Sequence, residues 1–275
     1  MPTLSIDAGV LYYETYGHGT PLVLVPGLGG VGLYWRPQVP AFAEHFRVIL
    51  YDHRGLGQST PAPIAARVED LAGDVLQFLD ALEIAQAHII GHSLGGAVAQ
   101  VMAIEYPERL ASLVLCASWP KADPWITRVG AVAKELLVQS GAAAFMQLLP
   151  LFLYPPWWVN AYSERLEREH ERVVAALPPP EIMVQRIDGL CAFNRHTELG
   201  QITTPTLVLG ARDDTLAPAY CSEALASLIP GAQLVLMERG GHACSHTVSE
   251  VFNSTVLSFL RAQAPHPTAL LESTR

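Results

Sequence analysis

The stretch HIIGHSLGGAVAQ, His88 to Gln100, sets an apolar segment against a run of small residues and places Ser93 between them. The first part is typical of a buried strand and the second of a closely packed helix. A turn from strand to helix at one residue strains the backbone there and crowds the positions two before and two after it. Gly91 and Gly95 occupy those positions and have no Cβ atom that would clash. The stretch therefore predicts a sharp strand-to-helix corner with Ser93 at its tip.

The pentapeptide from Gly91 to Gly95 fits the pattern G-x-S-x-G, which presents a nucleophilic serine at such a corner. The Ser93 hydroxyl would then be lifted out of the core at the positive end of a helix. Taken alone, the pattern also fits a glycine-rich turn that happens to contain a serine. Its position between a strand and a helix favours the nucleophile.

Composition indicates one α/β domain with an insertion. Of the 275 residues, half are apolar and 16% are charged, so the chain can bury a large core. The net charge of −9 is spread without acidic or basic blocks, which argues against nucleic acid or an anionic membrane as partner. No apolar run approaches the roughly 20 residues of a membrane span, and the first ten residues do not resemble a secretory signal. We therefore expect a cytoplasmic protein.

The cysteines bear on the same question. Cys116, Cys191, Cys221 and Cys244 are widely spaced and form no CxxC pair. This spacing favours free, mostly buried thiols in a reducing compartment and disfavours a structural zinc site.

Short runs rich in Val, Ile and Leu recur along the chain, as expected for strands that are covered on both faces. These runs are PLVLVPG (21–27), RVILYD (47–52), AHIIGH (87–92), SLVLCAS (112–118), TPTLVLG (204–210) and QLVLMERGGH (233–242). Helical patterns such as 67–84 separate several of them, so the fold class is α/β, with a mostly parallel, doubly wound sheet. Residues 4–19 are interpreted instead as a hairpin that leads into this sheet.

The alternation stops between residues 121 and 200, where the sequence is helix-like and rich in Trp, Leu and Arg. We interpret 1–120 and 201–275 as the core domain and 121–200 as a helical cap over the carboxyl edge of the sheet. Ligands bind at that edge in open α/β sheets.

An acid and then a histidine should follow the serine along the chain. Asp213 and Asp214 come just after a predicted strand, and His242 follows the last one. We assign His242 as the base for Ser93 and Asp214 as the group that orients the imidazole. Spacing to Pro218 favours Asp214 over Asp213, which then caps its loop.

Two other histidines lie near these positions. We expect His246 to be at the surface or behind the site. His92 is expected to line the sheet edge, with its side chain pointing away from that of Ser93.

A tetrahedral intermediate needs two N–H donors. We expect them from the backbone of Leu94, next to the serine, and of Leu28, in the loop VPGLGGVGLYW after the first core strand. That loop lacks the lysine of a phosphate-binding P-loop and the spacing of a dinucleotide fingerprint. The segment YDHRGLGQS (51–59) is interpreted as a tight polar turn that supports the site.

These motifs resemble those of the α/β-hydrolase superfamily over nearly the whole chain: VPGLGG, YDHRGLGQS, GHSLGG, GARDDTLAP and GGH. The resemblance implies that fold and a Ser–His–Asp triad. Pro26 stands where the family commonly has histidine, but it is not the expected donor, so the departure leaves the mechanism intact.

Two segments narrow the resemblance. PLFLYPPWWVNAYSERLEREHE (150–171) and GGHACSHT (240–247) are similar to the aminoacrylate (carbamate) hydrolases of bacterial pyrimidine utilisation, as is GLGGVGLYWRPQ. This similarity implies a small C–N substrate such as 3-aminoacrylate, which gives malonic semialdehyde and ammonia. Residues 37–59 are equally similar to 3-oxoadipate enol-lactonases, so the two activities stay open.

The cap contains further candidate residues for substrate binding. Trp157 and Trp158, with Phe152 and Tyr154, are candidates for the wall of a small apolar substrate pocket, or they form the core of the cap. Five arginines are candidates to hold a substrate carboxylate, although most of them lie in patterns of solvated helix; they are Arg165, Arg168, Arg172, Arg186 and Arg195.

The sequence thus predicts a serine hydrolase of a small metabolite that needs no metal or organic cofactor. Carbamate-type C–N hydrolysis is favoured, with an enol-lactonase or carboxylesterase as the alternative. Hydrolysis of C–C bonds, cofactor-free peroxidase activity and a non-catalytic ligand receptor rank lower. We expect a small-molecule substrate and no nucleic-acid or membrane partner, and a homodimer stays open.

Overall fold

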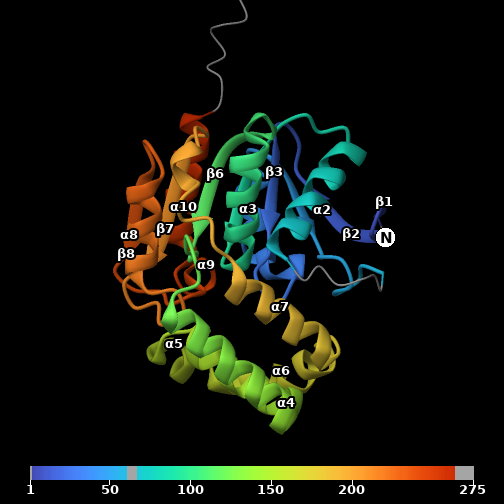
Figure 1. Cartoon of the computed structure of the whole chain (residues 1–275), viewed down its shortest axis with the longest axis vertical. Coiled ribbons are helices and arrows are strands. Elements are labelled where there is room, and N and C mark those ends of the chain that lie inside the picture. The colour runs from blue at the N-terminus through green and yellow to red at the C-terminus, as the bar shows by residue number, and fades with distance from the viewer. Residues whose placement is uncertain (1, 61–66, 264–275) are drawn as a thin grey trace, which may run out of the picture.

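The computed structural model describes residues 2–60 and 67–263. One eight-stranded sheet has the order β1-β2-β4-β3-β5-β6-β7-β8 (Figure 1). Its strands are β1 (Thr3–Ile6), β2 (Gly9–Tyr16), β3 (Pro21–Val25), β4 (Arg47–Tyr51), β5 (Ala87–His92), β6 (Leu110–Cys116), β7 (Thr206–Ala211) and β8 (Gln233–Met237). Strands β1 and β2 form the predicted antiparallel hairpin, β2 runs antiparallel to β4, and the rest of the sheet is parallel. The predicted sheet is confirmed.

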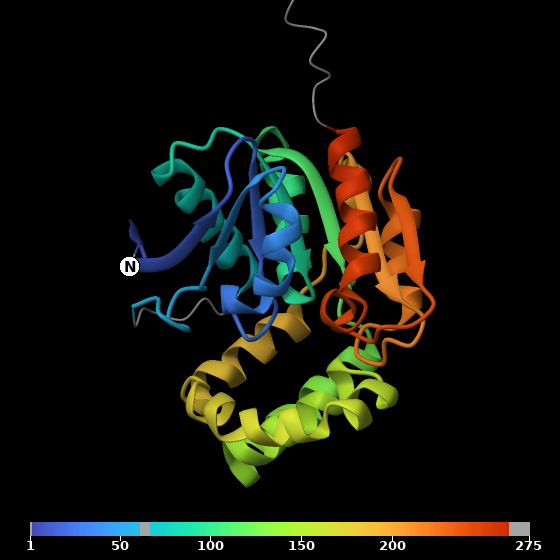
Figure 2. The same ribbon diagram turned by 180° about the vertical axis from the view of Figure 1, so that it is seen from behind.

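Helices cover both faces of the sheet, as Figures 1 and 2 show from opposite sides. One face carries α2 (Val68–Ala81), α3 (Leu94–Glu105) and α8 (Ala219–Leu228), whose apolar stripes pack on the strands in one cluster. The other carries η1 (Gly32–Gln38), α1 (Val39–Phe42) and α10 (Ser249–Ala262). The short turns η2 (Pro107–Arg109), η3 (Leu199–Gln201) and α9 (Cys244–Thr247) connect these elements. Burial of both faces explains why the central strands are almost entirely Val, Ile and Leu.

Four helices form a separate layer beyond one end of the sheet (Figures 1 and 2). They are α4 (Pro124–Leu153), α5 (Pro156–Ala161), α6 (Ser163–Ala175) and α7 (Pro180–Ala192), and all lie within the stretch 121–200. Their own apolar cluster is centred on Leu137, Phe145 and Ile187. The two chain segments at the base of this layer run side by side, with an antiparallel bridge between Lys121 and Asn194. We call these four helices the cap.

Helix α4 contradicts the expectation that no apolar run approaches membrane-spanning length. It has 30 residues, and its most apolar stretch has a mean hydropathy of 1.7. By length and composition it could cross a membrane, although one such helix is weak evidence for a span. Gly141 breaks its geometry with φ 83° and ψ 179°, which divides α4 into two shorter helices.

Strand register brings the predicted site residues to one edge. Gly91 in β5 lies opposite Val25 in β3 and Leu115 in β6, so the loops that follow these strands emerge together. The loops after β7 and β8 emerge at the same edge, because those strands continue the parallel sheet.

Candidate active site

Ser93 lies at the corner between β5 and α3 with φ 55° and ψ −120°, a conformation that few residues other than glycine adopt. Its amide donates to the carbonyl of Cys116 at 2.9 Å, which ties the corner to β6. A Cβ atom on Gly91 would lie 2.2 Å from the carbonyl oxygen of Gly95, and one on Gly95 would lie 2.4 Å from that of Val25. The predicted strain and the need for both glycines are confirmed.

The loops after β7 and β8 place an acid beside a histidine. His242 Nδ1 lies 2.9 Å from Asp214 Oδ2, and both residues are buried. The other oxygen of Asp214 accepts from the amides of Leu216 and Ala217 at 2.8 and 2.9 Å. These bonds fix the carboxylate, which holds the proton of His242 on Nδ1 and leaves Nε2 as the basic nitrogen.

His242 Nε2 is buried and has no hydrogen-bond partner among the described residues. No hydrogen bond joins it to Ser93 in that part of the chain, and such bonds in ligand-free sites commonly tighten only when substrate binds. The imidazole lies close to the corner, because its ring centre is 4.9 Å from that of His92, the neighbour of Ser93.

Asp213 has a different role from Asp214. Its Oδ1 accepts from the amide of Gly241 at 2.8 Å, so it braces the loop that carries His242 without touching the imidazole. The structure thus brings Asp214, and not Asp213, to the histidine.

His92 also braces the base loop, through a 2.9 Å hydrogen bond from Nε2 to the carbonyl of His242. Burial lowers the pKa of His92 well below its ordinary value, so the ring is neutral. Tyr34 stacks between His92 and His246, and His246 lies behind the site and is partly buried.

The loop after β3 passes directly beside the serine. A Cβ atom on Gly27 would lie 3.3 Å from the Cβ of Ser93. The amides of Leu28 and Leu94 have no hydrogen-bond acceptor within the described ranges. Two free N–H groups next to the serine are what an oxyanion hole requires.

A cavity of about 70 Å³ opens onto Ser93. The cap supplies most of its wall, from both halves of α4 and from α7. Apart from Ser93 the lining is apolar and uncharged: Leu28, Trp119, Ile126, Val129, Gly130, Ala133, Phe145, Leu148, Leu149, Phe152, Ile187, Leu190 and Leu216. Most of these residues were not singled out from the sequence. The spacing of the apolar positions 126, 129, 130 and 133 is that of one helix face, and this signal could have pointed to them.

The packing of Trp157 and Trp158 agrees with the alternative that this aromatic cluster belongs to the cap itself. Trp158 stacks on Tyr154 and Tyr162 inside the cap, and Trp157 is partly exposed beneath the guanidinium of Arg239. Neither lines the cavity at Ser93. Aromatic side chains do line this cavity, but Phe152 is the one member of the predicted aromatic group in its lining.

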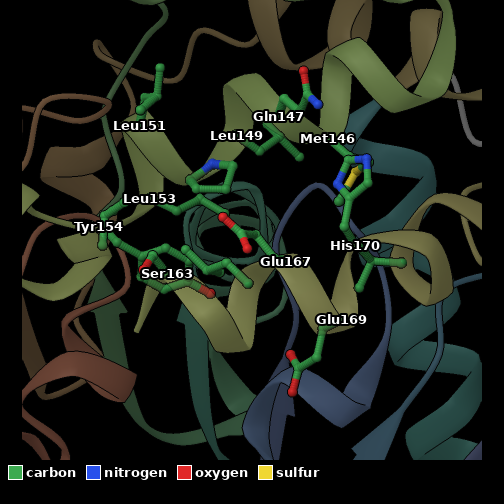
Figure 3. Close-up of a pocket in the computed structure, with 14 residues that line it drawn as sticks. Met146, Gln147, Leu149, Leu151, Leu153, Tyr154, Ser163, Glu167, Glu169 and His170 are labelled. Carbon is green, nitrogen blue, oxygen red and sulfur yellow. The ribbon is translucent and has the colours of Figure 1, made fainter. Parts of the chain in front are cut away.

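A second, larger cavity of about 440 Å³ lies within the cap between α4 and α6 (Figure 3). Met146 and Gln147 face it from α4, and Glu167 and His170 face it from α6. Leu149 lines both cavities. Ser163 and His170 both line the larger cavity, but they lie about two turns apart along α6, and no hydrogen bond joins them among the described residues.

No cap arginine lines the cavity at Ser93. Arg165 and Arg168 form exposed pairs with Glu169 and Glu164 along α6, and Arg172 is exposed. Arg195 lies at the base of the cap and binds three carboxylates, from Glu69, Glu105 and Glu198.

Arg186 is buried, and its guanidinium binds the loop that carries Leu28. None of the five candidate arginines is therefore placed to hold a substrate carboxylate in the cavity at Ser93.

The turn after β4 supports the same loop, as predicted. Asp52 accepts from the amides of Gly32 and Gln58, both at 2.8 Å. The amide of His53 donates to the carbonyl of Gly30 at 2.8 Å. Hydrogen bonds from the turn after β4 therefore hold the loop after β3 in its place beside Ser93.

Neither metal ligands nor a disulfide contribute to this site. Within residues 2–60 and 67–263, no group of three or more His, Cys, Asp or Glu could hold a metal ion. All four cysteines are free, and three of them are buried.

Comparison with known proteins identifies the family. A family model described as "alpha/beta hydrolase fold" matches residues 20–246. A protein of Stutzerimonas stutzeri named "Putative carbamate hydrolase RutD" is 43% identical over 259 residues, covering 92% of this chain and 97% of its own. A protein of the same name from Azorhizobium caulinodans is 40% identical over 249 residues, covering 90% and 94%.

Among solved structures, the enol-lactonase of Burkholderia xenovorans superposes with a TM-score of 0.86 at 27% identity, covering 94% of this chain and all of its own. Both resemblances drawn from the sequence, and the fold, are confirmed.

Proposed function

The chain belongs to the α/β-hydrolase family, and we propose that it hydrolyses a small carbamate-type substrate at its C–N bond, with Ser93 as nucleophile. It is a hydrolase by its family and by its carbamate-hydrolase relatives. One observation carries the mechanism: Asp214 holds His242 at Nδ1, and the free Nε2 lies buried beside the corner that presents Ser93.

The residues suit covalent catalysis. His242 Nε2 takes the proton of Ser93 as Oγ attacks the substrate carbonyl carbon, and Asp214 stabilises the imidazolium that forms. The carbonyl oxygen becomes an oxyanion, to which the amides of Leu28 and Leu94 donate. As the tetrahedral intermediate collapses, the C–N bond breaks and the imidazolium gives its proton to the leaving nitrogen. Water, deprotonated by His242, then releases the acyl group from Ser93.

For an enamine such as aminoacrylate, which has no scissile carbonyl, the same His242 would activate water directly. Ser93 would then orient the water instead of forming an ester. If this mechanism operates, turnover of aminoacrylate should fall less steeply in Ser93→Ala than in a variant that lacks His242.

The lining of the cavity favours a second candidate, a small neutral ester or lactone. No cation lines the cavity, and an unpaired carboxylate buried against Leu, Ile and Phe side chains is strongly unfavourable. The enol-lactonase relative supports the same candidate. In either reaction the group that enters the cavity is neutral, and any carboxylate of the substrate stays at its mouth.

The test compares wild type with Ser93→Ala on four substrates: a p-nitrophenyl ester, an enol-lactone, an O-alkyl carbamate and aminoacrylate generated in place. Ammonia release reports turnover of the carbamate and of aminoacrylate. For the carbamate it follows cleavage of either the C–N or the C–O bond, because carbamic acid decomposes to ammonia and CO2. We expect carbamate turnover above the spontaneous rate that falls by about 10⁴-fold or more in Ser93→Ala. Ester and lactone turnover without ammonia release would favour the second candidate. Absence of Ser93-dependent turnover on all four would contradict both.

The acid assignment has a matched pair of variants. Asp214→Asn should lower kcat by about 10⁴-fold, because His242 loses the partner that fixes its tautomer. Asp213→Asn keeps that partner and leaves an amide oxygen that can still accept from the Gly241 amide, so its loss should be far smaller. Equal losses in the two variants would contradict the assignment.

We also propose a cytoplasmic location, which the four free thiols fit, and a small molecule as the substrate.

A further inference from the structure

Arg186 on α7 is the one buried arginine in the described part of the chain, with 3% of its surface exposed. No carboxylate lies within salt-bridge distance of it among those residues, whereas Arg195 binds three. Burying a cation without an anion is costly, so its surroundings must supply strong acceptors.

Those acceptors belong to two segments. Gly27 and Leu28 lie in the loop after β3, which we call the oxyanion loop, and His53 lies in the adjoining turn after β4. Nε of Arg186 donates to the carbonyl of Leu28 at 3.0 Å, and Nη2 lies 3.5 Å from the carbonyl of Gly27. Nη2 also lies 2.9 Å from Nδ1 of His53. Burial lowers the pKa of His53 well below its ordinary value, so its neutral ring accepts at Nδ1. Burial also lowers the pKa of Arg186 to about 10, which leaves the guanidinium charged at neutral pH.

These contacts orient one peptide group. The carbonyl of Gly27 and the amide N–H of Leu28 belong to the same planar trans peptide and point in opposite directions. Gly27 O accepts from the amide of Gly30 at 3.0 Å and faces Arg186. The Leu28 N–H must then point away from Arg186, and it has no acceptor within residues 2–60 and 67–263.

We infer that Arg186 is a positioning residue of the cap that aims the Leu28 amide at the oxyanion formed on Ser93. Its charge also polarises the Gly27–Leu28 peptide, which makes the N–H a stronger donor. Because Arg186 comes from α7, the oxyanion hole is complete only when the cap is seated on the core. The inference rests on the proposed function, since it requires an oxyanion at Ser93.

The test uses the whole enzyme and three variants. Arg186→Met removes the donors but keeps an unbranched apolar stem, and Arg186→Lys keeps the charge without the fork of donors. Arg172→Met changes an exposed arginine of the same cap. Steady-state kinetics with the best substrate give kcat and KM. Butylboronic acid measures the oxyanion hole separately, because Ser93 Oγ adds to boron and leaves a tetrahedral adduct with one oxygen in the hole. Thermal unfolding reports folding.

We expect Arg186→Met to lower kcat by about 10- to 100-fold with KM nearly unchanged. Its affinity for butylboronic acid should fall by a similar factor. Arg186→Lys should fall between Arg186→Met and wild type, and Arg172→Met should match wild type. If Arg186→Met does not fold, Arg186→Lys with an unchanged Tm carries the same comparison of kcat and inhibitor affinity.

Two results separate the possible failures. Unchanged kcat in Arg186→Met, or a lowered kcat with unchanged boronic acid affinity, overturns the positioning role while the proposed function stands. Wild-type turnover that does not depend on Ser93 overturns the proposed function and the inference with it.

Discussion

At Ser93 the backbone is held at φ 55° and ψ −120° by neighbours that leave no room for relaxation. The amide is bound by Cys116, and the carbonyl accepts from Ser118 Oγ at 3.0 Å and from the amide of Gly96 at 2.9 Å. Strain of this kind costs on the order of 1–3 kcal/mol and persists only where the surroundings enforce it. The result is a serine fixed beside the two free amides of Leu28 and Leu94.

Gly95 tests this account at the residue scale. Gly95→Ala would push a methyl group to 2.4 Å from the carbonyl oxygen of Val25, so β3 and α3 must separate. We expect a loss of about 2 kcal/mol or more in unfolding free energy, together with loss of activity. Urea unfolding and ester turnover would measure both.

Gly73, in the middle of α2, is the control. A Cβ atom there meets nothing within 4 Å, so Gly73→Ala should stabilise the protein by up to about 1 kcal/mol. If both variants destabilise equally, close packing at the corner does not explain the glycine.

Among the elements, α4 does most to shape the cavity, because its two halves meet at an angle. Residues 126–133 line the cavity from the first half and 145–152 from the second. Gly141, with φ 83° and ψ 179°, makes the bend between them. A straight helix of this length could not place both segments around one small volume.

We therefore expect Gly141→Ala to raise KM. No atom lies within 4 Å of a Cβ there, so the cost is backbone strain alone, about 1–3 kcal/mol, which favours a different bend. Gly231→Ala carries similar strain, since its φ is 71° and its Cβ is also unobstructed, but it lies far along the chain in the loop before β8. KM and Tm of the two variants decide the matter: equal KM values would mean that the bend does not shape the cavity.

Over the whole molecule, the cap touches each loop of the proposed catalytic machinery. Trp125 Nε1 donates to the carbonyl of Thr215 beside Asp214 at 2.9 Å. The amide of Ala243, next to His242, donates to the carbonyl of Leu153 at 2.9 Å. Arg186 holds the oxyanion loop. The cap therefore does more than cover the cavity, because its position is linked to acid, base and oxyanion donors together.

Stability should depend on pH through the buried histidines of the core. Burial lowers the pKa of His53, His88 and His92 below their ordinary value of 6.5. In the unfolded chain these rings take up protons at their ordinary pKa, while in the folded protein they stay neutral. The unfolded state then binds more protons, so stability is lost as pH falls below about 6.5, by up to about 1.4 kcal/mol per pH unit for each ring.

His88→Asn isolates one of the three contributions. His88 lies at the start of β5, where Nδ1 bonds Ser112 Oγ at 2.7 Å, away from the catalytic corner. Asparagine can bond the same hydroxyl but does not titrate. Urea midpoints between about pH 7.5 and about pH 5.5 should fall less steeply in this variant than in wild type. Parallel slopes would contradict the assignment to His88.

Local patterns determined the sheet, the corner at Ser93 and the order of acid and base. Strand and helix periodicity, and the need for glycine beside a strained residue, act over a few neighbouring positions, so the sequence displays them directly. The family resemblance was visible for the same reason, because its motifs are these local turns.

Contacts between distant segments decided the rest. Asp214 and Asp213 are adjacent, and only the fold shows that one meets His242 and the other the Gly241 amide. The tryptophans 157 and 158 lie next to each other in a cap motif, yet they pack away from Ser93, because the bend of α4 and the seating of α7 decide which cap residues face the cavity. The sequence did not distinguish Arg186 from the other four candidate arginines. Only its burial against the loop after β3, 158 residues earlier in the chain, reveals what it binds. Packing between segments so far apart has no local periodicity, so the tertiary structure alone settles it.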